Sequence, residues 1–254
     1  MEAMGIVAVY SAKGGVGKTT IAVDLAWRMA HAGLSTVLWD LDPQGGSAFL
    51  LGEDQPVLPR AASLFQREGS PRRQVRPTRW DRLSLLQADD SLRALPLQLA
   101  RLGRRNRLAS LGRELLNDHQ RLVLDCPPHQ NEVSEQIITA ADLIVLPLPP
   151  SPLAARALDL LVRDIARIDR RHAPILPVIS MYDARRKAHR QAREGSMAQF
   201  AVIPQSSQIE QAAFRREPLG AFARRSAAGQ ALDRVWRTVE DKLAERRPAA
   251  AAAA

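Results

Sequence analysis

The chain has little cysteine, few aromatic residues and no long apolar run. It contains 254 residues, a single cysteine, Cys126, and 4% aromatic residues. One cysteine excludes an internal disulfide framework and fits a reducing compartment. No stretch approaches the ~18–20 apolar residues of a membrane-spanning helix, and no basic region precedes the first apolar segment as it does in a signal peptide. We therefore expect a cytoplasmic protein.

Lysine is also scarce, although the chain is basic. Only four of the 36 basic residues are lysines, the others are arginines, and the formal net charge is +9. A basic protein favours acidic partners, with nucleic acid first among them. The total charge alone decides little, because a charged fraction of 25% is ordinary. The placement of the charges is more informative, and two of the four lysines lie in one short segment.

That segment, residues 13–20, reads Lys-Gly-Gly-Val-Gly-Lys-Thr-Thr, the pattern of a loop that binds nucleotide phosphates. An apolar segment at residues 6–10 precedes it, and a helical pattern at residues 21–30 follows it. Glycines let backbone N–H groups curl around an anion, and the helix N-terminus adds its positive dipole end. Lys18 can then reach the β- and γ-phosphates, and the Thr19 hydroxyl can bind Mg²⁺. The expected nucleotide contacts are Gly14, Gly15, Val16, Gly17, Lys18, Thr19 and Thr20.

Lys13 is a second lysine in a loop that needs only one. In so short a loop, we expect its side chain to point away from the phosphates that its own backbone binds. A lysine there is best explained if it contacts a second nucleotide across a dimer interface. The loop therefore predicts a homodimer in the ATP-bound state.

Two further segments end in aspartate. The apolar residues 37–39 lead into Asp40 and Asp42, which are followed by Pro-Gln-Gly. We expect a strand that ends in both, since an i, i+2 spacing places two carboxylates on one face at the edge of a parallel sheet where ligands bind. Residues 122–124 are apolar and end in Asp125, an arrangement whose carboxylate holds a water of a Mg²⁺ shell. We therefore expect Thr19 and Asp125 to contribute to a magnesium site, and Asp40 and Asp42 to lie at the ligand-binding edge, with solvated acids in a turn as the alternative for these two.

These motifs, in this order, resemble those of the deviant-Walker P-loop ATPases of the ParA/MinD family. The resemblance covers roughly residues 5–245. It implies an α/β fold with a doubly wound, mostly parallel sheet and helices on both faces, in a single ATPase domain of residues 1–246. It also implies that Lys13 reaches the partner's active site and that Asp42 orients the attacking water. By the same resemblance, Asp42 joins Thr19 and Asp125 as a magnesium-binding residue, and Asp40 supports the metal site.

Other parts of the chain are less informative. By the same resemblance, Met181 and Pro204 lie near the adenine. The arginine-rich residues 53–113 contain a helical pattern at residues 92–116, with expected breaks at Pro96 and Gly103. His129 stands where the family has a small or hydroxyl residue, and this departure puts the behaviour of the loop around it in doubt.

The resemblance to ParA-like members implies a surface that binds double-stranded DNA without sequence preference. Arginine suits this task because its planar guanidinium can bind phosphate at two points. We expect no base stacking on single strands, because we find no interleaved aromatic residues. A merely solvated basic face is the alternative. The candidate DNA contacts are Arg215, Arg216, Arg224 and Arg225.

The expected function is slow ATP hydrolysis that a ParB-like or cargo-adaptor protein stimulates. A nucleoid-associated ATPase of this kind would segregate a plasmid or chromosome, or position a protein cargo. One alternative is a MinD-like regulator that cycles on membranes. The Pro/Ala-rich tail of residues 247–254, after a helix at residues 227–246, lacks the bulky apolar residues of a membrane-binding helix. The other alternative is a metabolic P-loop enzyme, although a nitrogenase-reductase relative would need more cysteines.

Overall fold

The fold is built on one eight-stranded sheet. The computed structural model describes residues 4–55, 60–66, 70–102, 106–128, 131–168, 172–195 and 197–245. The strand order is β3-β4-β2-β5-β1-β6-β7-β8, and only β3 runs antiparallel to its neighbour among the described strands. The strands are β1 (Gly5–Val9), β2 (Thr36–Asp40), β3 (Arg76–Pro77), β4 (Leu83–Leu86), β5 (Arg121–Asp125), β6 (Leu143–Leu148), β7 (Ile175–Tyr182) and β8 (Ala201–Pro204).

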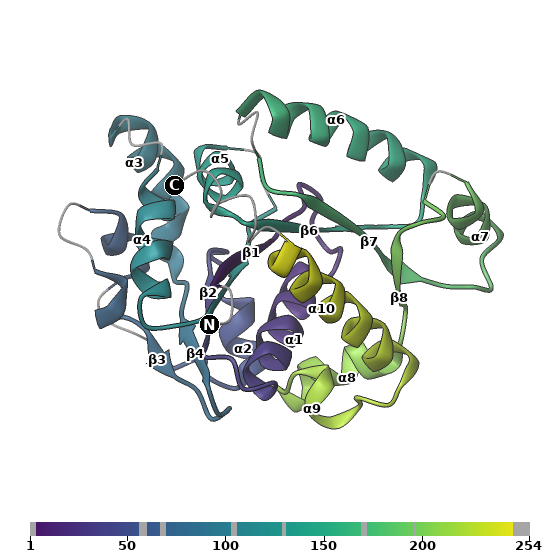
Figure 1. Ribbon diagram of the computed structural model, residues 1–254, viewed down its shortest axis with the longest axis horizontal. Helices are drawn as coiled ribbons and strands as arrows, with labels where there is room; N and C mark the ends of the chain where they lie inside the picture. The colour runs from purple at the N-terminus through teal and green to yellow at the C-terminus, as the bar shows by residue number, and fades with distance from the viewer. Residues whose placement is uncertain are drawn as a thin grey trace.

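Helices cover both faces of the sheet, as Figure 1 shows. One face packs against α1, α2, α9 and α10, and the other against α3, α4, α5 and α6. This burial on both sides explains why β1 and β6 carry no polar side chain and why β2 and β5 are apolar between their first and last residues. The helices are α1 (Lys18–His31), α2 (Gly46–Leu51), α3 (Leu95–Leu102), α4 (Arg107–Leu116), α5 (Glu132–Ala140), α6 (Pro152–Ile168), α7 (Lys187–Glu194), α8 (Ser207–Arg215), α9 (Leu219–Phe222) and α10 (Ala227–Glu245).

The topology places the end of β1 at the centre of the molecule. From β1 the chain first moves towards the β3 edge, and after β5 it returns past β1 to build β6, β7 and β8. Ligands of such sheets bind outside the carboxyl ends of the strands where the order reverses. The glycine-rich loop directly follows β1, so it lies at this position. The predicted fold class is therefore confirmed.

Two local predictions are wrong. The expected strand with two terminal aspartates ends at Asp40, and Asp42 lies in the turn that follows. Pro96 does not interrupt a helix, because it is the second residue of α3, and proline is tolerated in a first helical turn. Gly103, His129 and the tail of residues 247–254 lie outside the described residues.

Candidate nucleotide and magnesium site

The loop after β1 leads directly into the N-terminus of α1. Gly15 and Gly17 have φ values of 70° and 86°, in the left-handed region that favours glycine. Gly17 is the residue that precedes α1, and no side chain caps this helix end. The first N–H groups of a helix have no intrahelical partner. A phosphate at this position would accept their hydrogen bonds and would meet the positive end of the helix dipole.

The two loop lysines have opposite environments. The Lys18 side chain is buried, and its Nζ donates to the Lys13 carbonyl oxygen at 3.4 Å. Burial lowers the pKa of Lys18, and the nearby Asp125 and Asp42 oppose that shift. Lys13 is exposed to solvent. The loop therefore holds the Lys18 ammonium group against its own backbone and leaves the Lys13 side chain exposed to solvent.

Two buried carboxylates lie side by side at the carboxyl edge of the sheet. Asp40 ends β2 and Asp125 ends β5, they are register partners, and both are fully buried. Ser47 bridges them, since its hydroxyl donates to Asp125 Oδ2 at 2.9 Å and its backbone N–H donates to Asp40 Oδ2 at 3.0 Å. Asp42 donates its own N–H to Asp40 Oδ1 at 3.0 Å. The turn after β2 is therefore folded around Asp40.

Ser47 is a site residue that the sequence analysis missed. It follows the Asp-Pro-Gln-Gly-Gly segment and lies in the first turn of α2. Gly46 lets this helix approach the phosphate loop, because an added Cβ would lie 3.1 Å from Thr19 Cγ2. The available signal was a hydroxyl residue close to a strand-end carboxylate. Its bond to Asp125, 78 residues further on, depends on the pairing of β2 with β5.

The carboxylates have the electrostatics of a cation site. Burial raises the pKa of Asp125 to about 6, and burial together with the Asp125 charge raises the pKa of Asp40 well above its usual range. Asp125 Oδ1 is buried, and no group within the described ranges forms a well-aligned hydrogen bond with it. The Thr19 hydroxyl lies close enough to Asp125 to lower its pKa, but its position does not meet the geometry of a well-aligned hydrogen bond. A cation beside Thr19 and Asp125 would occupy this free oxygen.

The donor set fits Mg²⁺ in particular. Among the described residues, no three His, Cys, Asp or Glu side chains cluster as ligands of one ion. Mg²⁺ keeps several waters and binds one or two carboxylates together with substrate phosphates, so it does not need a complete protein cage. The Thr19 hydroxyl, Asp125 and the half-buried Asp42 match that pattern.

A pocket of about 140 Å³ adjoins the phosphate loop. Val16, Gly17 and Thr20 line one side, and Met181 and Pro204 line another, so the two residues predicted near the adenine lie beside the loop. Met181 has a φ of 58°, rare for a residue with a side chain, where the β7–β8 register is irregular. Its side chain is 46% exposed. This pocket has the size and the apolar lining for part of a flat aromatic ring system.

The four candidate DNA contacts have different surroundings. Arg224 and Arg225 are exposed between α9 and α10, and Arg215 is exposed at the end of α8. Arg216 instead forms an ion pair with Asp54 and lies over the Phe49 ring at 5.1 Å. Its charge is therefore partly neutralised within the chain.

Aromatic residues do occur in this basic region, contrary to the expectation from the sequence. Phe214 is 89% exposed, and the Arg215 guanidinium lies 4.7 Å from the centre of the Phe222 ring. A ring under a guanidinium holds it by a cation–π contact. The exposed Phe214 ring is thus available to stack on an unpaired base, which the sequence had led us not to expect.

Comparisons with known proteins identify a matching family and similar chains. Residues 4–178 match the AAA_31 family model, described as an AAA domain. The chain is 28% identical over 262 residues to the chromosome partitioning protein ParA of Caulobacter vibrioides, covering 97% of each chain. Apo McdA of Cyanothece superposes with a TM-score of 0.79 at 22% identity, over 94% of this chain and 99% of that one.

A metabolic enzyme is also similar. Cobyrinic acid a,c-diamide synthase of Mycobacterium smegmatis, in a structure with a bound ATP analogue and magnesium, has a TM-score of 0.71 and 26% identity. The match covers 84% of this chain and 91% of that one. The match to the family model extends over more than half of this chain, from β1 into β7. The chain therefore belongs to the AAA_31 family and is a P-loop ATPase of the ParA/MinD type.

Proposed function

We propose that this chain is a positioning or partitioning ATPase that uses ATP and Mg²⁺. The observation that carries the proposal is the pair of lysines in one phosphate loop, Lys18 buried and Lys13 exposed, beside the carboxylates of Asp40 and Asp125. The buried lysine and the helix N-terminus suit the phosphates. The exposed Lys13 side chain forms no ion pair with any carboxylate in the part of the chain that the structure describes. This supports a dimer with two nucleotides between its subunits.

In the proposed reaction, the chain's own residues bind, orient and exclude water. Lys18 and the loop N–H groups bind the β- and γ-phosphates, and Thr19, Asp42 and Asp125 hold the metal ion directly or through water. When bound, Mg²⁺ would neutralise charge that develops on the transferred phosphoryl group. Asp42 lies in the turn after β2, beside the buried Asp40 that fixes its backbone, and it orients the attacking water. The Lys13 of one subunit stabilises the phosphates held by the other.

The dimer would bind double-stranded DNA through its exposed arginines. Arg215, Arg224 and Arg225 are exposed and form no ion pair with any carboxylate that the structure describes. A guanidinium group without an ion-pair partner can neutralise a DNA phosphate and so release its counterions. Hydrolysis, stimulated by a ParB-like or cargo-adaptor protein, would separate the subunits and release the DNA. The cargo would be a plasmid, a chromosome or a protein assembly, carried over the nucleoid.

Two other functions remain as alternatives with distinct readouts. A membrane-cycling regulator would bind liposomes in a nucleotide-dependent way, which flotation measures. None of the described helices is long and apolar enough to cross a membrane. A metabolic synthetase is favoured only by the similarity to the diamide synthase. It would consume ATP in proportion to the amount of a small carboxylic acid that it converts as its acceptor substrate. The exposed Lys13 and the free arginines favour the positioning ATPase over this enzyme.

The decisive experiment is binding to random-sequence duplex DNA with ATP, with ADP and without nucleotide, over a salt series. If about five phosphates are neutralised per dimer, log K should fall with log salt at a slope of about −4.5. We expect such binding only with ATP, and we expect its loss in Arg224→Glu/Arg225→Glu and in Lys18→Ala, which cannot bind the phosphates.

The matched control is Arg101→Glu/Arg113→Glu, which changes the net charge equally but lies on α3 and α4, on the other face of the sheet. It should bind DNA almost as well as the wild type. Binding that is weak and indifferent to nucleotide, or equal loss in both double variants, would contradict DNA binding by this surface.

A further inference from the structure

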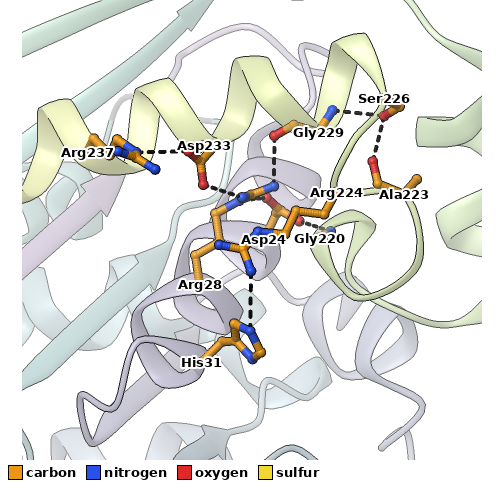
Figure 2. A network of polar contacts seen from close by, with 10 residues as sticks. All are labelled: Asp24, Arg28, His31, Gly220, Ala223, Arg224, Ser226, Gly229, Asp233 and Arg237. Atoms are coloured by element: carbon orange, nitrogen blue, oxygen red, sulfur yellow. Dashed lines mark hydrogen bonds and ion pairs between the residues drawn. The ribbon is translucent and has the colours of Figure 1, made fainter.

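A charged network is buried between α1 and α10 (Figure 2). Arg28 is 3% exposed, and each of its guanidinium nitrogens donates to a different oxygen. Nε donates to Asp24 Oδ2 at 2.5 Å, Nη1 to Asp233 Oδ1 at 3.0 Å, and Nη2 to the Gly229 carbonyl at 2.9 Å. The guanidinium therefore joins three points on two helices in one fixed orientation.

Such a network is a costly way to hold two helices together. Burying an ion pair removes both charges from water, and well-packed apolar side chains of similar size are often as stabilising or more so. The same helices already make apolar contacts, for example through Leu25, Met29 and Val235, all fully buried. Directional bonds add a defined orientation, which apolar packing alone does not supply.

The network holds the segment that carries two of the candidate DNA contacts. We call residues 223–226 the basic loop, since it contains Arg224 and Arg225 between α9 and α10. Before the loop, the Gly220 N–H donates to Asp24 Oδ1 at 2.6 Å. After it, the Gly229 carbonyl accepts from Arg28. The two helices that flank the basic loop are thus each bound, three residues from it, to the Asp24–Arg28 pair of α1, as Figure 2 shows.

The loop itself is closed by short-range bonds and close packing. The Ser226 hydroxyl donates to the Ala223 carbonyl at 2.7 Å and accepts from the Gly229 N–H at 3.0 Å. A Cβ on Gly229 would lie 2.3 Å from the Ala223 carbonyl oxygen and 2.7 Å from that of Arg224. Gly229 therefore packs directly on the backbone of the basic loop, and any larger residue must displace it.

Arg224 has a further contact with the same helix. Its Nη1 lies 3.5 Å from His31 Nε2, and the His31 ring stacks on Trp27 at a centroid distance of 4.6 Å. Helix α1 begins at Lys18, directly after the phosphate loop. Arg28 is ten residues further on, about 15 Å along the helix at 1.5 Å per residue. One rigid helix therefore begins at the nucleotide site and ends against the basic loop.

We propose that Arg28 is a positioning residue for DNA binding: through Asp24, Asp233 and Gly229 it holds Arg224 and Arg225 in the arrangement that contacts two backbone phosphates of duplex DNA. The inference rests on the DNA binding proposed above. Helix α1, which begins at the phosphate loop, then has a second role: the end of α1 far from the nucleotide site holds the basic loop in place. Arg28 itself is buried and does not touch DNA.

The test uses two variants that disturb the arrangement by different routes. Arg28→Lys keeps the positive charge next to Asp24 but cannot reach all three acceptors, because an ammonium is a compact point charge on a flexible stem. Gly229→Ala leaves every charge in place and displaces the backbone of the basic loop. The matched control is Arg237→Gln, since Arg237 is exposed and binds the other oxygen of Asp233 at 2.9 Å without contacting the loop.

ATP affinity, thermal stability and the salt dependence of DNA binding are measured on each variant well below its melting temperature. We expect ATP affinity within twofold of wild type for all of them. DNA affinity at about 100 mM salt should fall at least tenfold in Arg28→Lys and Gly229→Ala, with a slope clearly shallower than about −4.5 because phosphate contacts are lost. Arg237→Gln should keep both values. A lower melting temperature with an unchanged slope would mean a merely structural role and would overturn the proposal.

Hydrogen exchange separates this proposal from the proposed function. The Gly229 and Gln230 amides donate to Ser226 and report on the closure of the basic loop. Their exchange should be faster in Arg28→Lys than in the wild type and in Arg237→Gln. If the wild type bound no DNA, the proposed function would fail, while faster exchange would still support the positioning of the loop by Arg28. Unchanged exchange would overturn that positioning whatever happens with DNA.

Discussion

At the scale of single residues, the surroundings of a side chain decide what it can do. Lys13 and Lys18 belong to the same loop, yet one is exposed and the other is buried beside carboxylates. Arg216 and Arg224 were both expected to contact DNA. Arg216 pairs with Asp54, while Arg224 remains exposed and lies against a histidine. The two residues of each pair are of the same type, so only their surroundings in the fold distinguish them.

The pKa of Asp125 leads to a prediction on metal binding. Its raised value of about 6 means that without metal the carboxyl is protonated below pH 6 and ionised above it. Mg²⁺ binds the ionised form, so its apparent affinity in the presence of ATP should be nearly constant above about pH 7. It should fall up to tenfold for each pH unit below about 6, one proton being bound for each ion lost.

Isothermal titration of Mg²⁺ into the protein with ATP, between pH 5 and pH 8, measures this dependence. Parallel titrations of ATP alone give the correction for phosphate protonation. Asp125→Asn should bind Mg²⁺ more weakly at pH 7.5 and should lack the additional loss of affinity below pH 6. An equally steep dependence in this variant would mean that another group is responsible.

At the scale of secondary-structure elements, α1 and α10 pack together on one face of the sheet and support the nucleotide site. α1 carries the phosphate loop at its start and is buried along most of its length. α10 packs on α1 and on the sheet, and its Leu243 lies against the first residue of β1. An added Cβ on Gly5 would lie 3.0 Å from Leu243 Cδ2, so the helix and the central strand are in close contact. The last turn of α10 thus stabilises β1, the strand that leads into the phosphate loop.

We expect Leu243→Ala to lower the free energy of unfolding by about 2–5 kcal/mol, the usual cost of a Leu→Ala cavity in a core. Leu243 is only 5% exposed. Urea denaturation measures the change, and Asp241→Ala on the exposed side of the same helix is the control, expected to stay within about 0.5 kcal/mol. Equal stability of the two variants would show that the end of α10 does not contribute to the core.

At the scale of the whole molecule, the parallel sheet gathers the site from distant segments. The phosphate loop follows β1, Asp40 ends β2, Asp125 ends β5, and Met181 and Pro204 come from β7 and β8. All lie at the carboxyl edge, because parallel strands end at the same side of a sheet. The exposed Lys13 is part of the same edge, so a second subunit facing this edge would meet the nucleotide and the lysine together.

Dimerisation should therefore depend on Lys13. In an Asp42→Ala background, which should bind ATP and hydrolyse it slowly, light scattering with ATP and Mg²⁺ should give the mass of two chains. Addition of Lys13→Ala should give the mass of one chain with ATP affinity retained, because the lost contact is to the partner's phosphates. The control is Lys187→Ala, another exposed lysine far along the chain. An unchanged dimer would refute the role of Lys13 across the interface.

The sequence alone determined the local parts of this protein. Glycines before Lys18 and apolar runs that end in Asp40 and Asp125 predicted the loop and two of the strands, and the family that these motifs resemble implied the fold class. These features depend on neighbours within a few residues, where backbone freedom, helix capping and the apolar pattern act. Met181 and Pro204 were expected near the adenine by resemblance alone, since neither residue has a distinctive pattern.

Only the tertiary structure decided which distant residues meet. Ser47 reaches Asp125 because β2 pairs with β5, and Asp42 leaves its strand because the turn folds around Asp40. Arg28 binds Gly229, 201 residues away, and Asp54 takes up the charge of Arg216. Such contacts depend on strand order and helix packing, which arise from burial over the whole chain and leave no fixed spacing in the sequence.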